Sequence, residues 1–316
     1  MSEIGSAMSN AALQGTEHLR VAIRRRPGRW VATATVIVLA VYILFALATN
    51  QNFQWAIVGH YFLNGEVLAG LLLTLELTAL AMLIGIVLGT ILALMRRSGV
   101  ALVSWIAAAY IYVFRGVPPL VQLVFWYNLA TLYPSIRVGV PFGPVLFHVS
   151  TNSAISPLTA ALLGLGLSQA AYTAEVVRAG LMSVPRGQTE AGLALGMSRQ
   201  QIFWRIVQPQ AMRIIVPPIG NETIGMLKAS SLASVITLEE LLQSVTIIYT
   251  RTFQTIPLLV VASLWYLIVT SVLTVAQHYV ERRLGRHLTG SPGGATYSLM
   301  QGWWLRARRE GSKQDG

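Results

Sequence analysis

Six long stretches of this chain are almost free of charged side chains, and that feature decides what the chain can fold into. A helix needs about 20 largely apolar residues to cross a bilayer's hydrocarbon core of roughly 30 Å. Of the 316 residues, 54% are hydrophobic and 11% are charged, whereas soluble domains carry about 25% charged residues. We therefore predict six membrane-spanning helices, at residues 30–49, 67–95, 118–133, 157–177, 214–236 and 257–280.

The third of these stretches is irregular. The apolar region at residues 100–133 is too long for one span, and Arg115, Gly116 and two prolines interrupt it. Because proline kinks or starts a helix, we expect a helical segment near the membrane surface and then a span from about Pro118 to Tyr133. Residues 134–157 contain four prolines, and this composition predicts a loop.

Lysine and arginine are distributed unevenly among the connections between these spans. Short cytoplasmic loops are enriched in both residues. With the N-terminus inside, cytoplasmic segments hold nineteen of the 23 basic residues. The net charge of +11 is then mainly an orientation signal, and nucleic-acid binding is not needed to explain it. Segments 1–29 and 285–316 are both predicted to be cytoplasmic, and the second either contacts membrane lipid through Trp303 and Trp304 or is an unstructured tail.

Several chemistries are excluded by motifs that the chain lacks. There is no cysteine, and the five histidines show no spacing typical of metal ligands. Neither a G-x-S-x-G motif nor a G-x(4)-G-K-[ST] phosphate loop occurs, and the two lysines, Lys228 and Lys313, do not follow a glycine. The sequence thus predicts a protein that is not an enzyme, with no cofactor or metal bound by this chain.

The polar segment between the fourth and fifth spans, residues 185–212, is too apolar and too punctuated by proline for a simple linker. We predict one short helix from Pro185 that ends at Gly196, and a second that Ser198 caps and that runs to about Gln208. The second helix carries an apolar stripe at Ile202, Phe203 and Ile206. Such a stripe docks either on the membrane domain or in a groove of a partner.

This segment contains the pattern E-A-x(4)-G-x(9)-I-x-x-P, which resembles the EAA loop of type I ABC importer permeases. The matching residues are Glu190, Ala191, Gly196, Ile206 and Pro209, while Gly192 stands where the family usually has alanine and Gln208 where leucine is common. Four segments also resemble the polar amino-acid and opine branch of these permeases, at residues 114–123, 171–181, 183–198 and 221–236. The resemblance covers about residues 66–284 and leaves the span at 30–49 as an addition.

The resemblance implies an all-α integral membrane fold of about six helices, in which an extra N-terminal helix precedes a five-helix core. It also implies that a cytoplasmic coupling helix fits a cleft on separate ATPase subunits, which would hold ATP and Mg²⁺. The other implied partners are a second permease subunit, identical or related, an external binding protein, and an amino acid as the substrate. The expected location is the bacterial inner membrane.

Ionisable side chains inside spans cost about 2.5–3.5 kcal/mol each, so those present indicate partners or a water-lined path. Glu175, Glu222 and Lys228 are the candidates for a substrate pathway, and the resemblance adds a gate region at Lys228–Leu232 that includes Ser230 and Ser231. Glu222 and Lys228 are six residues apart and do not share a helix face. Glu175 either meets a substrate amine or pairs with Arg178 at i+3.

The charged residues inside the spans also fit another class of transporter. An ion-coupled secondary transporter or channel would use Glu175, Glu222 and Lys228 without an ATPase.

Arg115 is interpreted as a basic side chain that reaches the cytoplasmic surface. Gly85 and Gly89 form a GxxxG pattern suited to close helix packing, either within the chain or at a subunit interface.

Overall fold

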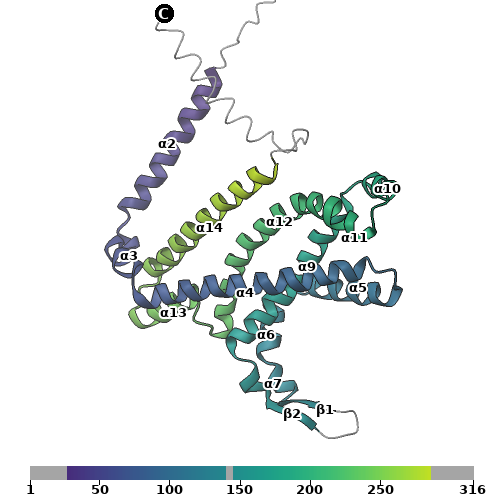
Figure 1. The fold of residues 1–316 in the computed structure, drawn as a ribbon. Coiled ribbons are helices and arrows are strands. Elements are labelled where there is room, and N and C mark those ends of the chain that lie inside the picture. Colours follow the sequence, from purple (N-terminus) through teal and green to yellow (C-terminus); the bar gives the residue numbers. More distant parts are fainter. Residues whose placement is uncertain (1–26, 140–144, 286–316) are drawn as a thin grey trace, which may run out of the picture. The chain divides into compact units, whose positions relative to one another are not determined.

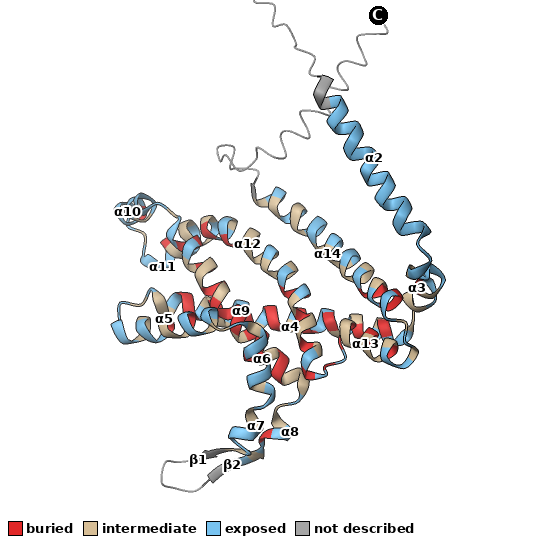
Figure 2. Ribbon diagram, turned by 180° about the vertical axis from the view of Figure 1, so that it is seen from behind, coloured by how far each residue is buried: buried red, intermediate tan, exposed pale blue. Residues whose placement is uncertain are grey.

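The computed structural model describes residues 27–139 and 145–285, which divide into two units. The first unit contains helix α2 (Pro27–Thr49) and the 3₁₀ turn η1 (Gln51–Phe53). From Trp30 onward every residue of α2 is exposed (Figure 2). Its 20 residues from Trp30 have a mean hydropathy of 2.6, so α2 has the length and composition of a membrane span. The predicted terminal segments fall almost entirely outside the described residues.

The second unit is built mainly from helices, with one small sheet (Figure 1). Its elements are α3 (Trp55–Phe62), α4 (Gly65–Arg96), α5 (Ala101–Gly116), α6 (Pro119–Tyr127), α7 (Leu129–Leu132), β1 (Ser135–Gly139), β2 (Val145–Ser150), α8 (Thr151–Ala154), α9 (Pro157–Met182), α10 (Arg186–Ala194), α11 (Arg199–Ile202), the π-helical η2 (Phe203–Val207), α12 (Gln208–Ala229), the 3₁₀ segment η3 (Ser230–Ile236), α13 (Leu241–Thr252) and α14 (Thr255–Gly285).

The two long helices α4 and α9 pack closely against each other. A Cβ atom on Gly85 would lie 2.4 Å from Cγ of Gln169, and one on Gly89 would lie 2.7 Å from the carbonyl oxygen of Ala170. Both glycines are buried. Since small residues let helix backbones approach, the GxxxG pattern has the packing role predicted for it. That packing is within the chain, against α9, so the alternative of a subunit interface at these glycines was wrong.

Buried side chains concentrate where α4, α6, α9 and η3 meet. Leu77, Leu123, Leu165 and Ile236 are each at most 2% exposed and belong to one cluster. A second cluster joins α3, α4, α13 and α14. Figure 2 shows the buried residues along α4 and α9, while the outer faces of α5 and α14 are exposed. The described core is therefore centred on α4 and α9, and its outward apolar faces are those expected to meet lipid or another subunit.

The helical segment predicted before Pro118 is α5, and the predicted break at the two prolines is confirmed. The third predicted span, Pro118–Tyr133, is wrong as one helix, because α6 and α7 stand in its place and α6 is bent at 99° to α5. The nine residues of α6 extend only about 14 Å, which is less than half the hydrocarbon thickness. The bend occurs at Val117–Pro118, because the residue before a proline disfavours helical backbone and proline supplies no N–H group. Within the described residues, four helices pass as candidate spans, or up to six when each bent pair counts as one.

The fifth predicted span also differs from the structure. Instead of a new helix near Ile214, one helical path runs from Arg199 to Ile236 through α11, η2, α12 and η3. Pro209 stands in the first turn of α12 and does not end the path. The wider π-helical turn directly before it accommodates the proline ring, which would otherwise clash with a carbonyl in the preceding turn.

Residues 134–157 are not wholly a loop, as was predicted. Strands β1 and β2 pair antiparallel, with Ser135 opposite Ser150 and a register irregularity after Val138. The β-branched and aromatic residues of the two strands favour this pairing. Of the four prolines on which the loop prediction rested, none lies within a strand, and Pro141 and Pro144 fall outside the described residues. The all-α fold class therefore holds except for this hairpin, at the end of the unit away from α10 (Figure 1).

Candidate coupling loop and transport cavities

Helix α10 ends in a turn that depends on Gly196. This residue has φ of 76°, a left-handed conformation that favours glycine. The N–H of Met197 donates to the carbonyl of Gly192 at 3.0 Å, and the N–H of Gly196 donates to that of Leu193 at 2.9 Å. These are the two hydrogen bonds of a Schellman motif. The prediction that Gly196 ends the first helix of the segment is confirmed.

The next helix begins with a capping box. The hydroxyl of Ser198 accepts from the N–H of Gln201 at 3.2 Å, and the side-chain oxygen of Gln201 accepts from the N–H of Ser198 at 2.9 Å. The predicted cap at Ser198 is confirmed. Because the same helical path continues to Ile236, this cap joins α10 directly to the helix that crosses the bundle.

Gly192 is where α10 packs on that helix. It is buried, and a Cβ at this position would lie 2.8 Å from Cγ1 of Ile202 and 3.4 Å from Cδ1 of Ile206. The position at which this chain departs from the usual alanine is thus a close helix contact. The opposite face of α10 is exposed and carries Glu190 and Ala191. One charged side chain among small ones offers a partner both close approach and a charge-assisted contact.

Two exposed leucines extend this outward surface. Leu193 is 48% exposed and Leu195 is 79% exposed. Ile206 is half-buried under α10, and Pro209 is exposed at the start of α12. We call the exposed residues Glu190, Ala191, Leu193 and Leu195 the coupling surface.

A cavity of about 230 Å³, which we call the central cavity, lies between α6, α9 and α12. Among the described residues that line it, Glu222 is the charged one, and Ser168, Gln169 and Tyr172 are polar. The Nε2 atom of Gln169 donates to Oε2 of Glu222 at 3.2 Å. Glu222 is only half-buried, so its other carboxylate lone pairs remain available to a ligand in the cavity.

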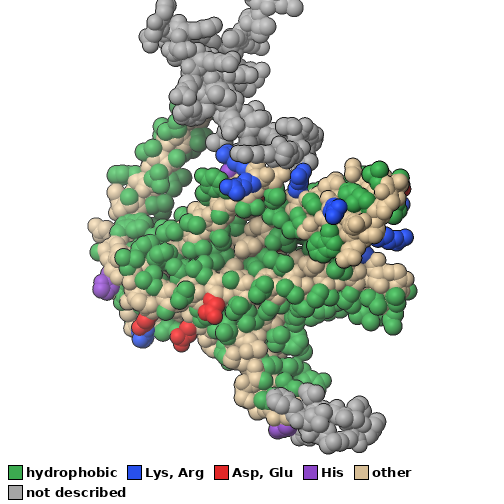
Figure 3. Space-filling view, in the orientation of Figure 1, with side chains coloured by type: hydrophobic (Ala, Val, Ile, Leu, Met, Phe, Trp, Pro, Cys, Tyr) green, Lys and Arg blue, Asp and Glu red, His purple; other side chains and the backbone are tan. Residues whose placement is uncertain are grey.

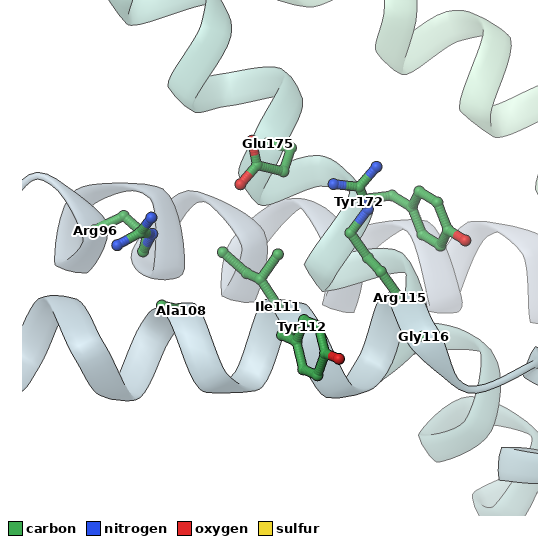
Figure 4. A pocket seen from close by; sticks show the side chains of 8 residues that line it. All are labelled: Arg96, Ala108, Ile111, Tyr112, Arg115, Gly116, Tyr172 and Glu175. Atoms are coloured by element: carbon green, nitrogen blue, oxygen red, sulfur yellow. The ribbon is translucent and has the colours of Figure 1, made fainter.

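A second cavity, of about 440 Å³, lies between α4, α5 and α9, and we call it the arginine cavity. Arg96, Arg115, Tyr172 and Glu175 contribute its polar lining. Figure 4 shows the Glu175 carboxylate and the Arg115 guanidinium pointing into this cavity, with Arg96 at the end away from Tyr172. Tyr172 lines both cavities, so the two are neighbours along α9.

The structure distributes the predicted pathway residues over different places. Glu175 pairs with Arg178 at 2.7 Å, which is the second of the two interpretations given for it. Lys228 is exposed, and it lines neither of the two cavities. The hydroxyls of Ser230 and Ser231 donate to carbonyls of their own helix, and Ser230 is fully buried. Of the five, only Glu222 and Glu175 line one of the two cavities.

One carboxylate was missed by the sequence interpretation. Glu240 is 0% exposed and precedes α13 at a 46° bend after η3. The N–H of Gln243 donates to its Oε1 at 3.0 Å, and the hydroxyl of Tyr266 donates to its Oε2 at 2.9 Å. The hydroxyl of Thr74 lies 3.3 Å from Oε2 and accepts from the N–H of Leu241 at 3.0 Å. Glu240 therefore ties α4, α13 and α14 together.

Gln169 and Tyr172 were also missed as cavity residues. Their signal lay in the i, i+3 spacing of polar side chains within an otherwise apolar span, continued by Glu175 at i+6. For Glu240 the sequence offered a weaker signal, because two adjacent glutamates before a helix are typical of an exposed N-terminus. Glu76, which the sequence placed inside a span, is exposed on α4.

Comparison with known proteins gives a consistent set of matches. The family model described as "Binding-protein-dependent transport system inner membrane component" matches residues 85–286. The arginine transport system permease protein ArgU of Corynebacterium glutamicum is 42% identical over 268 residues, covering 84% of this chain and 83% of that protein. The L-cystine transport system permease protein TcyB of Bacillus subtilis is 34% identical over 247 residues, covering 77% and 96% respectively.

Solved structures agree with these sequence matches. A chain from a crystal structure of an amino acid ABC transporter with histidines superposes with a TM-score of 0.59 at 33% identity, covering 69% of this chain and 94% of that chain. A chain of the MetNI methionine ABC transporter in an inward-facing conformation superposes with a TM-score of 0.53 at 20% identity, covering 70% and 96%. The second match concerns the fold alone.

Proposed function

Since this chain belongs to the family of binding-protein-dependent transport system inner membrane components, we propose that it moves amino acids through the inner membrane as the permease subunit of an ABC importer. The observation that carries the proposal is the geometry of the coupling loop. The capping box and Schellman turn hold α10 in one orientation, with Glu190 facing outward. This surface would fit a cleft on an ATPase subunit, and its motion would pass along the helical path from Arg199 to Ile236.

The substrate class is drawn from the relatives, whose names refer to arginine and cystine. The central cavity supports an amino acid, because a half-buried carboxylate such as Glu222 attracts an ammonium or another cationic group. Glu222 and the gate region at Ser230 and Ser231 would then belong to the pathway, with Lys228 at its edge. The pathway would be completed by a second permease subunit, identical or related.

The other components follow from what the chain lacks. No phosphate-loop motif occurs in its sequence, so ATP and Mg²⁺ would be bound by separate ATPase subunits. An external binding protein would deliver the amino acid. The relatives and solved structures above are ABC transporter components, and they give no support to the ion-coupled alternative.

The orientation of the chain in the membrane is inferred from the distribution of its basic and acidic side chains. On the face shown in Figure 3, basic side chains gather near α10, α12 and the end of α14, whereas acidic side chains gather around α13. Because cytoplasmic loops are enriched in lysine and arginine, the end that carries α10 would be cytoplasmic. Both chain termini and the coupling surface would then lie inside, and the β1–β2 hairpin outside.

The proposal is tested at the coupling surface. In Glu190→Ala and Gly196→Ala variants, we expect co-purified ATPase subunit and amino-acid uptake to fall by about tenfold or more, because central interface contacts and a left-handed turn are lost. The matched control is Gly187→Ala on the same helix, where an added Cβ meets nothing within 4 Å. Unchanged ATPase association and uptake in both test variants would refute the proposal.

A further inference from the structure

The contacts of Arg115 differ from those of the other arginines near the arginine cavity. It lies over the Tyr172 ring, 5.3 Å from the centroid. Arg96 donates to the Ser104 hydroxyl at 3.1 Å, and Arg178 donates to Glu175 at 2.7 Å. Among the residues that the structure describes, Arg115 has no hydrogen-bond acceptor or carboxylate partner. Its N–H groups are thus free to bind a ligand.

The acidic side chain that lines the arginine cavity, Glu175, is paired with Arg178 rather than with Arg115. Nε and Nη2 of Arg178 both donate to Oε2 of Glu175, at 3.0 and 2.7 Å. With that carboxylate already paired, Arg96 and Arg115 leave the cavity with an excess of positive charge. An anionic group is the ligand that such a cavity favours.

The two cavities carry opposite charge and lie along one face of α9. Gln169 holds Glu222 in the central cavity, and Tyr172, three residues later, carries Arg115 over its ring. Three residues of helix rise about 4.5 Å, so the two side chains of α9 that contact the charged groups, Gln169 and Tyr172, are about one turn apart. Tyr172 contributes to both linings. An amino acid carries a cationic and an anionic group on one small molecule, which matches this arrangement.

We propose that Arg115 binds the α-carboxylate of the transported amino acid, while Glu222 receives its cationic group. This inference rests on the proposed function and adds a specificity-determining residue to it. The planar guanidinium matches a carboxylate with two parallel hydrogen bonds, which a lysine ammonium does not reproduce. In the absence of substrate the Tyr172 ring holds the guanidinium by a cation–π contact, a weaker interaction that a carboxylate displaces.

The test uses the permease together with its ATPase subunits in lipid nanodiscs, without an external binding protein. The probes are radiolabelled L-arginine and agmatine, which differ by the α-carboxylate. We expect the wild-type complex to bind L-arginine about tenfold more tightly than agmatine, since one charge-assisted contact distinguishes the two ligands. In Arg115→Gln the two Kd values become equal, through weaker binding of L-arginine and unchanged binding of agmatine. Arg115→Lys restores part of the difference.

The control variant is Arg251→Gln, which removes the same charge from an exposed ion pair with Glu66 outside both cavities. It should keep the wild-type ratio of Kd values. An Arg115→Gln complex that still prefers L-arginine about tenfold would overturn the inference, as would a wild-type complex that binds the two probes equally or binds neither. If a complex with either of these results still retains its ATPase subunits, the inference about Arg115 fails and the proposed function does not. A permease that never retains an ATPase subunit would instead refute the proposed function.

Discussion

Two glutamates on either side of η3, Glu222 and Glu240, show how differently one side-chain type is used in this protein. Glu240 is 0% exposed, and hydroxyl and N–H groups from three helices surround its carboxylate. Glu222 is half-buried beside a cavity and receives one donor, from Gln169. A buried carboxylate whose acceptor sites are occupied holds structure together, whereas one with free lone pairs beside a cavity is available to a ligand.

The largest effect is expected from Glu240→Ala. This change leaves the Tyr266 hydroxyl without its acceptor and removes the side-chain cap of α13. We expect the free energy of unfolding to fall by about 3 kcal/mol, from unsatisfied buried groups and a lost cap together. Thermal unfolding of the purified complex in detergent measures it. Glu222→Ala is the matched control and should change stability by less than about 1 kcal/mol, as removal of one partly exposed hydrogen bond does. Equal losses in the two variants would remove the distinction.

The next effect concerns transport rather than stability. Glu222→Gln keeps the shape of the side chain and removes the negative charge of the central cavity. We expect kcat/KM for amino-acid uptake by cells that make the complete transporter to fall about tenfold, equivalent to about 1.4 kcal/mol. The exposed neighbour of Glu240 is the control, and Glu239→Gln should leave uptake unchanged. Wild-type uptake by Glu222→Gln would show that this carboxylate is not part of the pathway.

The smallest effect is expected from Tyr266→Phe, which removes one hydrogen bond to Glu240 and keeps the ring. The free energy of unfolding should fall by about 1 kcal/mol, the usual worth of one hydrogen bond. Thermal unfolding under the same conditions measures it, and Tyr133→Phe at a 63% exposed position is the control. A loss as large as that of Glu240→Ala would mean that Tyr266, rather than the carboxylate, holds the three helices together.

Much of the local structure follows from short sequence patterns. The capping box at Ser198 and the Schellman turn at Gly196 involve residues within five positions of each other, so the sequence alone predicts them. The apolar runs at 30–49, 67–95 and 157–177 predict long helices for the same reason, because a helix satisfies its backbone hydrogen bonds within the segment. The 99° bend between α5 and α6 was not predicted as such, since the two prolines mark a break but do not determine its angle.

The side-chain arrangements that sequence patterns missed depend on contacts between distant segments, whereas the missed backbone features are local. The continuous helix through Pro209 requires the π-helical turn η2, and the sequence pattern did not predict this turn. From the sequence alone, Glu240 is interpreted as a surface charge. In the structure, the hydroxyls of Thr74 and Tyr266, from two other helices, are hydrogen-bonded to its carboxylate. The cation–π contact of Arg115 with Tyr172 likewise joins α5 to α9.

The sequence by itself determined that the chain has the composition of a membrane protein, where the long helices α2, α4 and α9 lie, and how α10 ends and α11 begins. These properties depend on hydrophobicity, charge counts and hydrogen bonds between near neighbours, all of which act over one or two helical turns. Only the tertiary structure decided which carboxylate is structural and which faces a cavity. Burial and hydrogen-bond partners of a side chain come from helices far apart in the chain, and their packing sets both.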